Sequence, residues 1–177
     1  TRKESSAASD VYKRQGYVAK KMGLPIDKLI VATNENDILQ RVINTGEYKP
    51  GKVKPSWSPS RDRQITSNFE RLLFNILNKE DNKVRDLMNN LNDKGSFKLD
   101  DKAINEIKKD FEAVKISDEE TLSIIKNIYD KENFIVDPHT ATAFGGVDQI
   151  KGINNVVVFG TAHQYKFFET IKKATGK

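Results

Sequence analysis

The sequence predicts an α/β fold built on a doubly wound parallel sheet. Two short apolar runs rich in β-branched residues, 29–32 and 156–159, are typical of strands buried on both faces. Stretches with apolar residues at the helical period alternate with them. A long block, residues 67–134, has a helical pattern and interrupts this alternation. We therefore expect one α/β unit that carries a helical insertion.

The composition excludes several classes of site. The chain has 177 residues, about one domain by length, and no Cys. Disulfides, thiolate zinc sites and cysteine nucleophiles are therefore excluded, and two histidines are too few for a multi-histidine metal site. We predict no metal. No run of roughly 18 apolar residues occurs, and the start lacks the layout of a signal peptide, so we predict a cytoplasmic protein without a membrane segment.

The first fifteen residues differ from the rest. They are polar, rich in Ser and Ala and without apolar periodicity, and residues 10–15 resemble a translated sequencing-library adapter. We predict that residues 1–15 are a disordered, non-native segment and that the chain begins inside a larger protein at Gly16. Without them, 26 basic residues stand against 23 acidic ones, a net charge of +3. This charge is scattered, so we predict no nucleic-acid partner.

Residues 16–66 are predicted to form a helix–strand–helix unit and a long loop. A helix over 17–22 ends at Gly23, a strand follows at 29–32, and a helix begins near Ile38 and ends at Gly46. The connection that follows, residues 47–66, contains three prolines. Connections this long within a compact domain are usually functional or disordered. Its single tryptophan, Trp57, is predicted as a packing anchor, with the wall of a binding cleft as the alternative.

Residues 67–134 are predicted to form a helical insertion or subdomain. Four stretches place apolar residues on one helical face, and the third of them ends at Phe111. The fourth is preceded by Ser117 and Glu120, which match a capping box. Lys and Glu dominate the other faces, as on an ordinary solvated surface.

Residues 135–177 are predicted to return to the α/β pattern. Residues 134–136 and 156–159 are predicted strands, and a helix over 142–150 lies between them. Gly145 and Gly146 weaken this helix by about 1 kcal/mol each relative to Ala, but they permit close backbone approach. A last helix is predicted over residues 164–173.

Three polar segments follow predicted strands. They are residues 32–34, 137–140 and 160–163, and ligands of open α/β sheets bind beyond the carboxyl ends of the strands. Each segment also has a structural explanation. Thr33 or Asn34 can cap a helix, Asp137 can fix a turn, Thr161 can cap the last helix, and His163 can serve as a structural hydrogen-bond donor. No Walker loop, dinucleotide fingerprint or nucleophile elbow is present, so composition and spacing name no reaction.

Four motifs occur in order along the chain. They are Gly16–Pro25 running into Ala32–Asp37, Ser58-Pro59 followed by Ser67–Leu73, Asp137–Ala141, and Thr161–Phe167. Together they resemble the threonine synthase family. The resemblance extends over residues 16–177, and it matches the longer family type, which carries a helical insertion between the second and third motifs.

The resemblance implies a pyridoxal-phosphate enzyme of the tryptophan-synthase-β-like fold, also called fold type II. Such an enzyme converts O-phospho-L-homoserine and water to L-threonine and phosphate. The Schiff-base lysine and the loop that holds the cofactor phosphate belong to the amino-terminal half and are absent here. We therefore expect an incomplete doubly wound sheet, no catalytic residue in this chain, and the missing amino-terminal half as its partner. The 177-residue fragment is predicted to be inactive alone.

The resemblance also implies which residues bind the cofactor. Thr161 is predicted to place its hydroxyl at the pyridine nitrogen, where a hydroxyl can donate to a neutral nitrogen or accept from a protonated one. Gly160 lets the ring approach the backbone closely. Thr33 and Asn34 are predicted to face the cofactor because they follow the strand nearest the phosphate loop.

Substrate contacts are predicted for Asn68, Arg71 and His163. An arginine suits bidentate binding of phosphate or carboxylate, so Arg71 is predicted to meet the substrate. The alternative is that Glu70 and Arg71 are surface residues. His163 is predicted to orient Thr161 or to line the pocket.

The sequence departs from the family pattern in two places. Gln164 and Tyr165 stand where Pro-Ala is common, and Arg61 and Arg63 stand where apolar residues are common. Two other functions stay open. One is a different pyridoxal-phosphate lyase of this fold, such as a threonine dehydratase or a cysteine synthase relative. The other is a non-catalytic adaptor that uses helices 67–134 as its surface.

Overall fold

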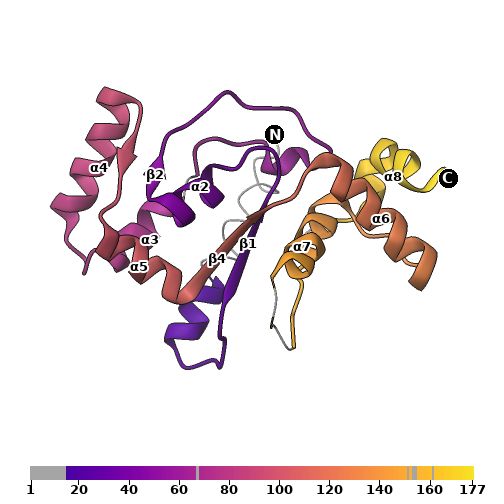
Figure 1. Cartoon of the computed structure of the whole chain (residues 1–177), viewed down its shortest axis with the longest axis horizontal. Helices are drawn as coiled ribbons and strands as arrows, with labels where there is room; N and C mark the ends of the chain where they lie inside the picture. Colours follow the sequence, from indigo (N-terminus) through magenta and orange to yellow (C-terminus); the bar gives the residue numbers. More distant parts are fainter. Residues whose placement is uncertain (1–14, 67, 151, 153–154, 161) are drawn as a thin grey trace.

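A parallel pair of strands forms the centre of the molecule (Figure 1). The computed structural model describes residues 15–66, 68–150, 152, 155–160 and 162–177. Strand β1 (Leu29–Thr33) pairs with β4 (Phe111–Lys115), with Leu29 opposite Phe111 and Thr33 opposite Lys115. Both strands therefore present their carboxyl ends at the same edge of the sheet.

Helices cover both faces of this pair, as the apolar run of β1 predicts. Side chains alternate along a strand, so Val31 points to one face and Ala32 to the other. Val31 packs with α2 (Ile38–Thr45) and α5 (Asp101–Asp110), whereas Ala32 lies under α7 (Pro138–Gln149). The α/β prediction is confirmed.

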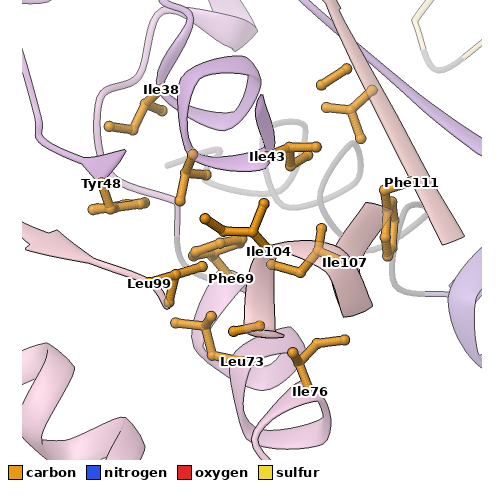
Figure 2. Packing of buried hydrophobic residues seen from close by; sticks show 14 of the residues in the cluster. Ile38, Ile43, Tyr48, Phe69, Leu73, Ile76, Leu99, Ile104, Ile107 and Phe111 are labelled. Atoms are coloured by element: carbon orange, nitrogen blue, oxygen red, sulfur yellow. The ribbon is translucent and has the colours of Figure 1, made fainter. Parts of the chain in front are cut away.

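The larger core lies between the sheet and helices α2, α3 (Phe69–Ile76) and α5 (Figure 2). A short antiparallel pair, β2 (Glu47–Tyr48) with β3 (Phe97–Lys98), closes it, and α4 (Asp81–Lys94) packs outside. The Tyr48 ring stacks on Phe69 at 5.5 Å and on Phe97 at 4.8 Å. Full burial of one such side chain stabilises the fold by about 2 kcal/mol. The core includes Ile38, Val42, Ile43, Leu73, Ile76, Leu99, Ile104 and Ile107.

A second core joins α6 (Asp118–Glu132), α7 and α8 (Phe168–Thr175) on the other side of the sheet (Figure 1). Ile125 and Ala141 are completely buried in it. The predicted capping box at the start of α6 is confirmed, because both of its reciprocal hydrogen bonds between Ser117 and Glu120 are present. Within the part of the chain that the structure describes, no helix is long and apolar enough to span a bilayer.

The glycine pair in α7 brings this helix close to the sheet. A Cβ atom at Gly146 would lie 3.0 Å from the Cβ atom of Ala32, and one at Gly145 would lie 3.0 Å from Cδ1 of Ile116. A distance of 3.0 Å is shorter than about nine in ten real Cβ contacts. The predicted close approach is therefore confirmed, and the absent side chains explain why two weak helix formers occupy the middle of α7.

One predicted helix end was wrong, and two predicted strands form no ladder among the described residues. Phe111 opens β4 instead of ending a helix, so β-structure returns within the block that was predicted to be helical. Residues 134–136 and 156–159 have no regular secondary structure, and among the described residues they join no ladder. Val157 is 76% exposed and Phe159 64% exposed. A strand needs a neighbour of matching register, and no apolar run can indicate by itself where its neighbour lies.

A helix over residues 15–21 begins the described chain and ends, as predicted, before Gly23 in a left-handed conformation. Asp110 holds this helix through ion pairs of 2.9 Å to Lys20 and 2.8 Å to Lys21. Residues 1–14 lie outside the described residues. The division of the chain at residues 15, 66 and 134 stays a prediction.

Candidate functional site at the carboxyl edge of the sheet

The long connection after β2 crosses the carboxyl edge of the sheet, from the side of β2 toward α6 and α7 (Figure 1). We call residues 54–62 the strap. It includes one short 3₁₀ turn, η1 (Pro59–Arg61). The strap links the first two of the three polar segments that the sequence predicted to converge.

Asn34 ties the end of β1 to the strap. Its side chain is 1% exposed, and its Nδ2 atom lies 2.6 Å from Oγ of Ser56, 3.1 Å from Oγ of Ser58 and 2.7 Å from Oδ1 of Asp62. Its Oδ1 atom accepts from the backbone N–H of Asn36 at 2.9 Å. Every polar atom of this amide therefore has a partner within the protein.

Thr33 has a partner in the sheet. Its hydroxyl donates to the Val114 carbonyl at 3.1 Å, and the residue is buried. Neither Thr33 nor Asn34 caps the following helix, because Asp37 is the N-cap residue of α2. The structure therefore shows both predicted cofactor residues at the strand end, with internal hydrogen bonds.

Asp137 organises the start of α7. Its carboxylate accepts from the backbone N–H groups of His139 and Thr140, from the Thr140 hydroxyl, and from Nδ1 of His139 at 2.9 Å. Burial raises the pKa of this carboxyl, but the hydrogen bonds from His139 and Thr140 outweigh burial and lower its pKa below the usual value. Asp137 thus does more than fix a turn, because it also orients the His139 ring.

The strap contacts α7 through two residues. The backbone N–H of Ser60 donates to Nε2 of His139 at 3.1 Å. The Arg61 guanidinium donates from Nη1 to the Ala32 carbonyl and from Nη2 to the His139 carbonyl at 2.8 Å. Arg61, which departs from the family pattern, therefore bridges β1 and α7.

The third polar segment lies beside the second. A Cβ atom at Gly160 would lie 3.5 Å from Oγ1 of Thr140, and the Phe167 ring meets the His139 ring edge-on at 4.8 Å. Thr161 lies outside the described residues. His163 is exposed, where it caps the 3₁₀ turn η2 (Gln164–Phe167) and stacks on Tyr165 at 5.0 Å. Its Nδ1 atom accepts from the Tyr165 N–H, so it acts as an acceptor and not as the donor considered above.

Asn68 and Arg71 lie in a different place. Arg71 is exposed, and its Nη1 atom donates to Oδ1 of Asn68 at 2.9 Å. Both border an apolar groove that also includes Tyr17 and Phe111. Phe111 begins β4, whereas the polar network lies where β4 ends. Asn68 and Arg71 thus lie near the start of β4, whereas Thr33 and Asn34 lie near its end.

Charged and aromatic groups complete the carboxyl edge. Lys115 pairs with Glu35 at 3.0 Å and with Asp37 at 3.7 Å, and the hydrogen bond with Glu35 raises the pKa of Lys115. Asp118 accepts from the backbone N–H of Trp57 at 3.1 Å, and burial raises the pKa of Asp118. Lys173 lies 4.4 Å above the Trp57 ring. Trp57 therefore attaches the strap to α6 and α8, in agreement with its prediction as an anchor.

Comparison with known proteins finds threonine synthases. The chain is 38% identical over 161 residues to threonine synthase of Pseudomonas aeruginosa and 39% identical over 178 residues to that of Saccharomyces cerevisiae. Each alignment includes 90% of this chain. The chain is therefore similar to threonine synthases over most of its length. No family model matches it.

Solved threonine synthases share its fold. The crystal structure of the pyridoxal-phosphate-bound threonine synthase of Brucella melitensis superposes with a TM-score of 0.90 at 40% identity, over 93% of this chain and 36% of that one. The chain also spans 34% and 35% of the length of the Pseudomonas and yeast relatives. The predicted recognition and fold class are therefore confirmed, for a chain that matches about one third of its relatives.

The sequence indicated no site role for several residues of this network. His139, Arg61 and Asp62 form much of it, but only His163 was nominated of the two histidines. One signal was present for His139, because it lies two residues after an N-cap aspartate, within its hydrogen-bond reach. Ser60, its partner at the other ring nitrogen, is 79 positions away in the chain, and no local pattern could reveal that contact.

Proposed function

We propose that this chain is the carboxyl-terminal part of a threonine synthase that converts O-phospho-L-homoserine and water to L-threonine and phosphate. One observation carries the proposal, which is the similarity over at least 90% of this chain to threonine synthases, one of them a pyridoxal-phosphate complex. The proposal includes a cytoplasmic location. It also includes an amino-terminal half that supplies the Schiff-base lysine and the phosphate loop.

The residues at the carboxyl edge suit such a cofactor. Apart from its chain neighbours, a Cβ built at Gly160 would meet Oγ1 of Thr140 at 3.5 Å among the described atoms, so the backbone is open to close approach at this turn. When bound, pyridoxal phosphate would supply the electron sink for elimination and replacement at the substrate side chain. We propose that the Thr161 hydroxyl bonds the pyridine nitrogen and that Thr33 and Asn34 form the adjoining wall.

Within this proposal, Asn68 and Arg71 bind substrate groups and His163 orients the turn that carries Thr161. Arg71 is exposed and held by Asn68 on the rim of the groove, where its guanidinium is accessible to an anion. This rim lies near the start of β4, whereas the strap lies near its end. Arg71 would therefore contact a substrate at the carboxyl edge only together with elements that the other part of the enzyme supplies.

The decisive experiment uses the longer protein that contains this sequence. We expect it to release phosphate from O-phospho-L-homoserine and form threonine, and to use this substrate in preference to serine or threonine. A preference for serine or threonine would instead favour a dehydratase-like lyase. The 177-residue chain, mixed with pyridoxal phosphate and reduced with borohydride, should show no stoichiometric pyridoxyl adduct by mass spectrometry. A specific adduct would contradict the proposed absence of the cofactor lysine.

A further inference from the structure

His139 occupies a central place in the network described above. It is 4% exposed and contacts three separate parts of the chain. Asp137 bonds one ring nitrogen, Ser60 of the strap bonds the other, and Phe167 of η2 meets the ring edge. The carbonyl of the same residue accepts from Arg61 of the strap. One side chain therefore links α7, the strap and the turn that follows Gly160.

The partners of His139 determine where its proton lies. A backbone N–H can only donate, so Nε2 facing the Ser60 N–H must be the unprotonated acceptor. In a neutral ring, Nδ1 then carries the proton and donates to Oδ1 of Asp137. In the opposite tautomer, the Nε2–H group would face the Ser60 N–H, and the unprotonated Nδ1 would face the Asp137 carboxylate, so neither hydrogen bond could form. The buried Asp137 carboxylate thus stabilises the tautomer that can hold the strap.

The strap depends on this acceptor because its other contacts are to different elements. Ser56 and Ser58 bond Asn34 at the end of β1, and Trp57 bonds Asp118 of α6. Near α7, the strap is held by Ser60 through the His139 ring and by Arg61 through the His139 carbonyl. Loss of the ring acceptor would leave the half-buried Ser60 N–H without its bond, at a cost in free energy that favours displacement of the strap.

We propose that His139 is a positioning residue that, oriented by Asp137, holds the strap against α7 at the carboxyl edge of the sheet. The part of the inference that concerns turnover rests on the proposed function, because it requires the cofactor site to lie at this edge. A displaced strap would lower the fraction of enzyme that is competent to bind substrate. The apparent affinity then falls in proportion, whereas bound enzyme reacts normally.

The test compares two variants at this position in the full-length enzyme. His139→Leu removes the acceptor, whereas His139→Gln retains an amide oxygen that can accept from Ser60. Ile125→Val, a change in the second core away from the strap, serves as the control for general loss of stability. Hydrogen–deuterium exchange of peptides over residues 56–62 and steady-state kinetics with O-phospho-L-homoserine are measured for each.

For His139→Leu we expect exchange over residues 56–62 to accelerate about tenfold and KM to rise about tenfold, with kcat changed less than about threefold. In His139→Gln both the exchange rate and KM should stay close to the wild-type values, and Ile125→Val should change neither. Unchanged exchange in His139→Leu would overturn the proposal, as would faster exchange with unchanged KM. If the wild-type enzyme does not turn over this substrate but exchange in His139→Leu accelerates as expected, the proposed function is wrong and the role of His139 in holding the strap is supported.

Discussion

A single buried amide shows how much of the site depends on individual side chains. Asn34 donates to three side-chain oxygens of the strap, and one of them belongs to the Asp62 carboxylate. An amide can fill this place because it donates and accepts at once. A carboxylate of the same shape can only accept.

Asn34→Asp should therefore be strongly destabilising. At pH 7 this change places a second negative charge beside Asp62, at a position that is only 1% exposed. We expect a loss of about 3 kcal/mol or more in the free energy of unfolding. Urea denaturation measures it. The loss should shrink in acid, where the new carboxyl regains a proton to donate. Asn127→Asp, on the exposed face of α6, should change stability by less than about 0.5 kcal/mol. Equal effects of the two changes would contradict the assigned role.

Asp137 should make stability depend on pH. Its folded-state pKa lies below the usual value, so it stabilises the fold above the pKa of the unfolded chain, and this stabilisation is lost as the pH falls through the lower folded pKa. We expect a decline in the free energy of unfolding that begins below about pH 4. Asp137→Asn should cost about 1 to 2 kcal/mol at pH 7 and should flatten this decline. Asp148→Asn, exposed on the same helix, should retain it. A decline of equal steepness in Asp137→Asn would refute the assignment.

At the scale of elements, the contact between α7 and β1 depends on the absence of two side chains. The Cβ position of Gly146 faces the Cβ atom of Ala32, which is fixed to the backbone of a strand. The Cβ position of Gly145 faces the ends of the Ile116 and Ile124 side chains, which can rotate. The two glycines should therefore respond differently to the same substitution.

Gly146→Ala should destabilise the protein by about 1 kcal/mol or more, because overpacking outweighs the helix propensity that Ala adds. Gly145→Ala is the matched comparison and should stay within about 1 kcal/mol of the wild type, since isoleucine ends can yield and Ala favours the helix. Chemical denaturation of both variants decides this. A more stable Gly146→Ala protein would show that α7 can move away from the sheet without cost.

The helices were predictable from the sequence because their signals are local. Apolar residues recur at the helical period through α2, α3, α5 and α6, and glycine or a capping box marks several ends. Strand β4 was missed for a related reason. Phe111 continues the apolar face of Ile104 and Ile107, so the periodicity passes beyond the true end of α5. Only pairing with β1 distinguishes the two interpretations, and that pairing is not local.

The candidate site was predictable in outline at the same scale. Polar segments after strands were expected to converge, and the second and third do so directly, at Thr140 and Gly160. The first reaches the second through the strap, whose path depends on contacts such as Arg61 with Ala32. An arginine at an apolar family position indicated a difference there, but it did not indicate what the side chain would bond.

For the whole molecule, the exposed run at residues 156–159 is the most informative surface. Val157 is 76% exposed although its neighbours are β-branched or aromatic. In the proposed enzyme, a strand from the amino-terminal half would pair with this run and cover it. Such pairing would explain an apolar run that has no ladder within the described chain.

Val157→Lys should therefore reduce the stability of the full-length enzyme more than that of the 177-residue chain. We expect the 177-residue chain to keep its stability within about 0.5 kcal/mol, because the side chain is exposed. The full-length enzyme should lose about 1 to 3 kcal/mol, the cost of burying a misplaced cation or distorting the strand pair. Thermal denaturation of both proteins gives the comparison. Val157→Ile should be neutral in each, and an equal response to lysine in both would argue against a covering strand.

The pairing of β1 with β4 has a consequence for how the chain folds. Thr33 and Val114, which share a hydrogen bond across the sheet, are 81 positions apart in the sequence. Closing so long a loop costs entropy before any strand contact repays it, whereas helical hairpins such as α3–α4 form from neighbouring residues. We expect the helices to appear early in refolding and the sheet, with the carboxyl edge that it supports, to form last.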